Sequence, residues 1–169
     1  MCIRDSLPRT GINWQNRGCS FSLDPQHLNV LAPGKKPFHT LNPALARLKD
    51  GRTMVYGTMG GDGQPQTQAA VFTRYAVFGQ AVQQAITAPR WLLGRTWGQS
   101  SDSLKLESRF APEIIDGLRK LGHEVDVIAE FDEMVGHAAA IVRDADGIFA
   151  GGFDPVSYTH LRAHETPEH

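Results

Sequence analysis

The sequence predicts an α+β fold, and three patterns carry this prediction. Short β-rich stretches alternate apolar with polar residues, two helical stretches follow each other after a glycine-rich turn, and an Asp-Gly turn separates two late strands. Hairpins combined with a tandem helix pair favour α+β layering over a strict βαβ alternation. The 169 residues, 41% of them hydrophobic, suffice for one domain with its own core.

The first half of the chain predicts strands and loops followed by helices. Residues 7–38 are rich in Gly, Pro, Asn and Ser, which favours strands and loops. Residues 53–59 predict a strand that enters a tight turn at residues 60–63. Residues 65–78 predict a helix that is apolar nearly all round and therefore buried, with Pro65 in its first turn and Gly79 after it. Residues 81–88 predict a second, short helix that ends before Pro89.

The second half predicts two strands and the clearest helix. Residues 103–108 alternate leucines with charged residues, the pattern of a half-buried strand. Pro112 begins a helix that stops at Gly122. Its predicted apolar face consists of Ile114, Ile115, Leu118 and Leu121. Residues 125–131 alternate again and predict a strand.

A hairpin is predicted near the end of the second half. Residues 138–142 and 148–151 are the two strands, and residues 144–147 form the turn with the Asp-Gly signal.

Composition narrows the possible partners. The formal net charge of −1 comes from scattered charges of both signs, so neither nucleic acid nor a membrane surface is expected to bind. No apolar run approaches the roughly 18 to 20 residues of a membrane span. The two cysteines, Cys2 and Cys19, are too few for a disulfide framework and lack the spacing of a zinc site. No cofactor is predicted. The N-terminus does not read as a signal peptide, and cytoplasmic and periplasmic locations both stay open.

Both ends of the sequence look foreign to the fold. Residues 156–169 hold three of the seven histidines without strand or helix periodicity, and they resemble a translated sequencing-adapter tail. Residues 1–6 resemble the matching head. We expect the functional segment to be residues 7–155. A metal cluster of the tail histidines is the less favoured alternative, because no carboxylate pattern accompanies them.

A glycine loop, residues 57–65 (GTMGGDGQP), is the first candidate site. Glycines let a ligand approach the backbone amides, and the start of the following helix adds unpaired donors and partial positive charge. Such a loop can form an oxyanion hole. A P-loop is excluded because no lysine follows the glycines, and a dinucleotide fingerprint because Gln66 stands where its third glycine is needed. A turn without a ligand remains an equal alternative from the residues alone.

Five ordered blocks resemble the small subunit of gamma-glutamyltransferases. They are residues 11–22 (GINWQNRGCSFS), 33–43 (PGKKPFHTLNP), 57–61, 88–90 (APR) and 151–155 (GGFDP). The resemblance implies part of the N-terminal-nucleophile hydrolase fold, a four-layer αββα sandwich. It also implies that Gly60 and Gly61 are the oxyanion-hole pair, and that a large subunit cut from the same precursor is the partner.

The resemblance implies that the nucleophile is absent from this sequence. In the family a threonine, exposed by self-cleavage, lies upstream of the block that begins at Gly11, and its own amino group is the base. Thr10 has too little chain before it to be that residue. We therefore expect an incomplete piece of an enzyme, inactive by itself.

Four positions depart from the glutathione-cleaving members of the family. Ser20 stands where those members place the acid that holds the α-ammonium group of the substrate, and Arg17 replaces their glutamine. His39-Thr40 replaces their Ser-Ser pair, which binds the α-carboxylate. A serine and an arginine disfavour an ammonium group, so the predicted acyl group has a carboxylate without an ammonium. Oxamate fits that description, and the blocks resemble the oxamate amidohydrolase branch.

Simpler interpretations stay open. Arg17 alone would be read as a surface arginine, and His39 as a core or turn histidine. Hydrolase and transferase activities are not distinguished. The rival function is a non-catalytic structural or interaction module that keeps the fold.

Overall fold

The computed structural model describes residues 4–7, 10, 12–15, 17–94 and 101–156, the backbone alone at 4–7 and 12–15. The chain divides into two compact units, Met1–Leu41 and Asn42–His169. Residues 157–169, with the three histidines of the predicted tail, lie outside the described residues.

The first unit consists of strands and loops, as its composition predicts. β1 (Arg4–Leu7) pairs antiparallel with β2 (Ile12–Gln15), and the 3-10 turn η1 (Gly18–Ser20) follows. The remaining chain is irregular apart from a bridge between Ser22 and Val30. Residues 4–6, assigned to the foreign head from sequence, are part of β1.

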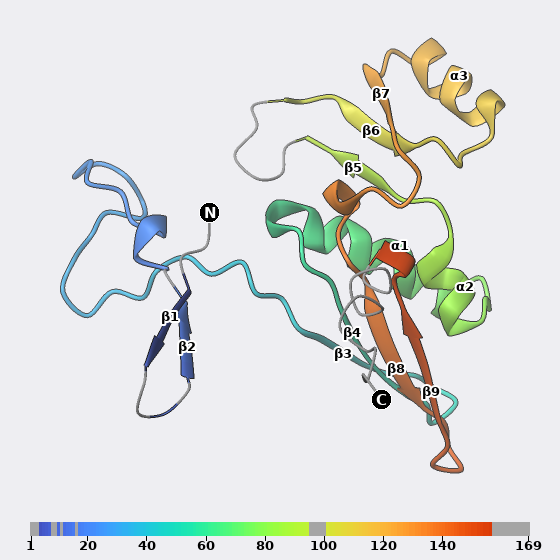
Figure 1. The fold of residues 1–169 in the computed structure, drawn as a ribbon, viewed down its shortest axis with the longest axis horizontal. Coiled ribbons are helices and arrows are strands. Elements are labelled where there is room, and N and C mark those ends of the chain that lie inside the picture. Colours follow the sequence, from blue (N-terminus) through green and yellow to red (C-terminus); the bar gives the residue numbers. More distant parts are fainter. Residues whose placement is uncertain (1–3, 8–9, 11, 16, 95–100, 157–169) are drawn as a thin grey trace, which may run out of the picture. The chain divides into compact units, whose positions relative to one another are not determined.

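The second unit is built on a four-stranded antiparallel sheet in the order β3-β4-β8-β9 (Figure 1). The strands are β3 (Ala44–Arg47), β4 (Thr53–Gly57), β8 (Ala139–Arg143) and β9 (Phe149–Phe153). The predicted hairpin is confirmed: β8 and β9 pair, and Gly147 in their turn has φ +89°. This conformation suits glycine, which explains the Asp-Gly signal.

Two helices cover one face of this sheet (Figure 1). They are α1 (Gln64–Ala76) and α2 (Val82–Thr87), the predicted tandem pair. The core between sheet and helices contains Met54, Val71, Tyr75, Val82, Ala85, Ile86, Ala138, Ala140 and Val142. The prediction that α1 is buried all round is wrong. Ala69 is exposed, as are Val77 and Phe78 beyond its end, because the helix packs on a single layer and its outer side meets solvent.

A smaller three-stranded sheet, β5-β6-β7, extends the second unit. β5 (Trp91–Leu93) is antiparallel to β6 (Leu104–Glu107), and α3 (Pro112–Lys120) connects β6 to the parallel strand β7 (Val125–Ile128). The chain therefore contains one βαβ unit within an otherwise α+β arrangement.

Two expectations for α3 and β7 need correction. Ile115 is buried on α3 and Leu118 packs beside it, whereas Ile114 and Leu121 are exposed, because α3 covers only the short β6-β7 pair. β7 ends at Ile128 rather than at residue 131. Phe131 has φ +53°, which is incompatible with a strand.

Strand β6 is buried on both faces, so the prediction of a half-buried strand is wrong. Lys105 and Glu107 are 4% and 0% exposed. The Lys105 ammonium donates to the Gly94 carbonyl and the Ser101 hydroxyl, both at 2.7 Å. The Glu107 carboxylate accepts the Arg90 amide at 2.7 Å and pairs with Arg109 at 2.5 Å. Polar partners thus compensate buried charges that the pattern alone assigns to solvent.

The face of the four-stranded sheet opposite the helices is open and apolar. Leu45, Val55 and Ile141 are partners across three strands and are 63%, 43% and 43% exposed. A groove of about 580 Å³ runs over this face and reaches Gly57 and Phe153 at its end. No helix among the described residues is long and apolar enough to cross a bilayer.

Candidate oxyanion site

The glycine loop lies at the junction of sheet and helix, as predicted. β4 ends at Gly57, the 3-10 turn η2 (Gly61–Gly63) follows, and α1 begins at Gln64 with Pro65 in its first turn. Gly60 has φ +128° and Gly61 has φ +54°. Side chains rarely tolerate these conformations, so the backbone path itself requires two consecutive glycines.

The amides at the start of η2 make no hydrogen bond within the turn itself. The first hydrogen bond in the turn runs from the Gly63 amide to the Gly60 carbonyl at 3.0 Å. The amides of Gly61 and Asp62 precede it, so the turn itself provides them with no acceptor. The thirteen-residue helix α1 directly follows and adds the positive end of its dipole. Gly60 and Gly61 both lie outside the strands, Gly60 buried and Gly61 half-buried.

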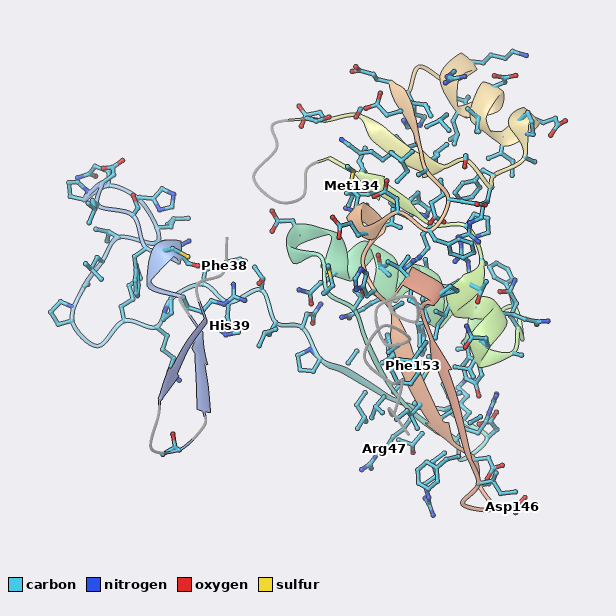
Figure 2. All side chains as sticks on the ribbon, in the orientation of Figure 1. Phe38, His39, Arg47, Met134, Asp146 and Phe153 are labelled. Carbon is cyan, nitrogen blue, oxygen red and sulfur yellow. The ribbon has the colours of Figure 1, made fainter. Side chains whose placement is uncertain are left out.

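A second turn packs against the loop. It is η3 (Glu133–Val135), which ends at Gly136. A Cβ built on Gly60 would lie 3.6 Å from the Gly136 Cα, so the two backbones are in contact. Figure 2 labels Met134 on this turn. This turn was not predicted from the sequence, although its two ends are marked there by Asp132 and Gly136. Asp132 accepts the Met134 amide at 2.8 Å, and Gly136 has φ +87°.

Buried polar groups hold η3 in place. The Arg90 guanidinium donates to the carbonyls of Gly136 at 3.1 Å and Val135 at 3.4 Å, and it pairs with Asp154. The Thr67 hydroxyl on α1 donates to the same Val135 carbonyl at 2.9 Å. Arg90 and Asp154 are 1% and 0% exposed. Arg90 belongs to one of the family blocks but received no role from sequence.

Two further arginines surround the end of α2. Arg74 donates to the carbonyls of Ala85 and Ala88, and Arg109 to that of Thr87. These contacts satisfy the last carbonyls of the helix, where positive charge is favourable. Burial and the neighbouring Arg90 charge lower the pKa of Arg74 from its usual value.

The four substrate-binding candidates lie in the first unit. Arg17 and Ser20 come together in η1, where the Ser20 amide donates to the Arg17 carbonyl at 3.0 Å. His39 (Figure 2) is exposed and its Nδ1 accepts the Leu41 amide at 3.1 Å, as in a turn histidine, and Thr40 is half-buried. The glycine loop belongs to the second unit. Their approach to Gly60 and Gly61 therefore stays a prediction.

Within the described residues, no three His, Cys, Asp or Glu side chains gather closely enough to hold a metal ion.

Comparison with known families decides the assignment. A profile of the family described as gamma-glutamyltranspeptidase matches residues 6–163. The chain belongs to the gamma-glutamyltranspeptidase family. It is 70% identical over 151 residues to an oxamate amidohydrolase proenzyme of Klebsiella pneumoniae, a match covering 89% of this chain and 29% of that protein. It is 49% identical to a glutathione hydrolase-like proenzyme of Bacillus subtilis, covering 86% of this chain and 28% of that protein.

Structural comparison agrees with the family assignment. A gamma-glutamyltranspeptidase variant from Helicobacter pylori superposes with a TM-score of 0.70 at 23% identity, covering 90% of this chain and 85% of that one. The chain therefore has an α+β part of the N-terminal-nucleophile hydrolase fold. It spans less than a third of the curated relatives that it matches.

Proposed function

We propose that this chain is the oxyanion-binding part of an N-terminal-threonine amidohydrolase or acyltransferase that acts on a small amide. The observation that carries the proposal is the pair Gly60 and Gly61, held in glycine-only conformations where a strand turns into a helix. Amides fixed in this way stabilise charge that develops on a carbonyl oxygen. The threonine nucleophile is expected outside these 169 residues.

The chemistry of such a site proceeds in two stages. The threonine hydroxyl attacks the amide carbonyl, its own α-amino group takes the proton, and the carbonyl oxygen becomes an oxyanion next to the Gly60 and Gly61 amides. The tetrahedral intermediate then expels the amine, which takes the proton, and leaves an acyl ester on the threonine. Water in a hydrolase, or an amine in a transferase, releases the acyl group and restores the hydroxyl.

The substrate that fits best is oxamate or a similar amide with a carboxylate and no ammonium group. Arg17 offers a fixed positive charge for the carboxylate and Thr40 a hydroxyl, and His39 can carry charge. Ser20 provides no negative charge for an ammonium. The higher identity to an oxamate amidohydrolase proenzyme than to a glutathione hydrolase-like one, 70% against 49%, supports this choice.

A second protein segment is needed to complete the fold. Among the described residues, no second sheet covers the open face of the four-stranded sheet, as one does in an αββα sandwich. The two proenzyme relatives are more than three times as long as this chain. We propose that the large subunit from the same precursor supplies that layer.

The test is turnover by the complete protein that contains this chain. We expect ammonia release from oxamate to exceed glutamate release from glutathione at equal concentration. Dipeptide formation with an added amine acceptor measures the transferase reaction. A complete protein that cleaves neither amide would support the rival, a non-catalytic module that keeps the fold.

A further inference from the structure

We propose that the segment of residues 132–136, with Gly136 as its contact residue, is a buried brace that positions the oxyanion loop. Arg90 and Thr67 are the positioning residues that fix this brace. The inference rests on the proposed function, because it assigns these residues to the work of Gly60 and Gly61.

The contact between the brace and the loop leaves no room for a side chain. A Cβ on Gly136 would overlap the Met59 carbonyl oxygen and the Thr58 hydroxyl. On the other side, the Gly136 Cα lies within van der Waals reach of a Cβ built on Gly60. The backbone at Gly136 is therefore the surface on which residues 58–60 rest.

The brace is fixed by hydrogen bonds that water does not reach. Both carbonyls at its end, those of Val135 and Gly136, accept bonds from Arg90, and Thr67 adds a second bond to Val135. Thr67 and Val135 are 3% and 2% exposed. Buried charge-assisted bonds of this kind tolerate little displacement.

Other parts of the fold in turn fix the two positioning residues, Arg90 and Thr67. Asp154 pairs with the Arg90 guanidinium, and Glu107 accepts the Arg90 amide. Thr67 is on α1, the helix into which the glycine loop runs. The loop is thus clamped between the helix that it starts and a turn that is bonded to that helix.

With this arrangement, we expect the brace to affect the catalytic step more than the binding of the substrate. Moving the brace would rotate the peptides of the glycine loop, whereas the candidate carboxylate-binding residues lie in the other unit. A displacement of about 1 Å in reacting geometry can lower a rate about 100-fold. Variants of the brace should therefore lower kcat and leave KM nearly unchanged.

The experiment compares Gly136→Ala with Gly147→Ala in the complete, self-processed protein. The two glycines have nearly equal φ, +87° and +89°, but a Cβ on Gly147 meets only the Arg143 guanidinium at 3.6 Å in an exposed hairpin turn. We expect Gly136→Ala to lower kcat for oxamate about 10- to 100-fold with KM within about 3-fold. Gly147→Ala should stay within about 2-fold of the unaltered protein in both parameters.

If Gly136→Ala does not fold, two less disruptive variants at Thr67 test the same proposal. Thr67→Val keeps the shape and removes the bond to Val135, and we expect kcat to fall about 3- to 10-fold. Thr67→Ser keeps the hydroxyl and should restore most of the rate.

The outcomes separate this proposal from the proposed function. An active protein in which Gly136→Ala turns over like Gly147→Ala, or Thr67→Val like Thr67→Ser, overturns the brace alone. An equal rise in KM for the brace variants also overturns it. An unaltered protein with no amide turnover overturns the proposed function and the brace together.

Discussion

At the scale of single residues, we propose that Arg17 and Ser20 set the substrate specificity. η1 brings Arg17 and Ser20 within one backbone hydrogen bond of each other. The Arg17 guanidinium disfavours an ammonium group and attracts a carboxylate, and Ser20 supplies no negative charge. If it faces the substrate as we propose, the turn favours acyl groups that carry a carboxylate over acyl groups that carry an ammonium.

Removing the positive charge at position 17 and adding a negative charge at position 20 should change the substrate preference. We predict that the double variant Arg17→Gln with Ser20→Asp lowers kcat/KM for oxamate at least about 10-fold and raises the value for glutathione, because the new carboxylate can hold an α-ammonium. Kinetic assays with both substrates measure the change. Arg17→Gln with Ser20→Asn has similar size without the negative charge and is the control. If both double variants behave alike, charge at position 20 does not set specificity.

At the scale of elements, close backbone packing joins the helices to the sheet. Gly152 on β9 faces α2, where an added Cβ would lie 2.9 Å from the Ile86 Cδ1 and 3.2 Å from the Gln83 backbone. Its neighbour Gly151 points the other way, with nothing within 4 Å. α2 can approach β9 only because position 152 has no side chain.

Filling this space should destabilise the fold. We predict that Gly152→Ala lowers the free energy of unfolding by about 1–3 kcal/mol, the usual effect of overpacking. Gly151→Ala, one residue away on the open face, should change it by less than about 0.5 kcal/mol. Urea unfolding of both variants tests the prediction. Equal stability for the two would show that α2 can move away from β9 without loss.

The elements that sequence predicted well are those with local signals. The strand, glycine turn and helix at residues 53–76 follow from β-branched residues, glycines and Pro65, all adjacent along the chain. Burial of β6 was not predictable in this way, because alternation reports the polarity of Lys105 and Glu107 but not their partners. Two of those partners, Gly94 and Arg90, come from other segments of the chain and are brought to the strand by the fold.

Only part of the candidate site is likewise marked by local signals in the sequence. Gly60 and Gly61 carry a signal in their own sequence, whereas the brace at Gly136 contacts Gly60 from a segment more than seventy residues away. The hydrophobic periodicity of a sequence does not indicate contacts between such distant segments. The proposed approach of Arg17 and Thr40 to the loop stays a prediction, because these residues belong to the other unit.

At the scale of the whole molecule, the helices and strands that the structure describes leave one apolar face of the four-stranded sheet uncovered. The helices bury one face, and the row of Leu45, Val55 and Ile141 remains exposed on the other. Exposed apolar patches of this kind mark interaction surfaces or cause aggregation. In an αββα sandwich this is the face that meets the second sheet.

Charges on this face should prevent assembly. We predict that Val55→Lys with Ile141→Lys abolishes co-purification of this chain with the large subunit when both are expressed together, because two buried ammonium groups would oppose packing. Leu121→Lys, an exposed position after α3, is the control and should assemble normally. Normal assembly of the double variant would place the subunit interface elsewhere.

The central claim is that the peptide between Gly60 and Gly61 presents an amide to the oxyanion, and kcat of Gly60→Ala in the complete protein tests it most directly. Alanine cannot adopt φ +128° without strain, so this peptide must rotate and turn the Gly61 amide away. Gly51→Ala is the matched control, since Gly51 has φ +90° and an added Cβ lies 3.5 Å from its nearest neighbour. We predict a loss in kcat for oxamate of about 100- to 1,000-fold for Gly60→Ala and less than about 2-fold for Gly51→Ala. Equal kcat values for the two folded variants would contradict the oxyanion assignment.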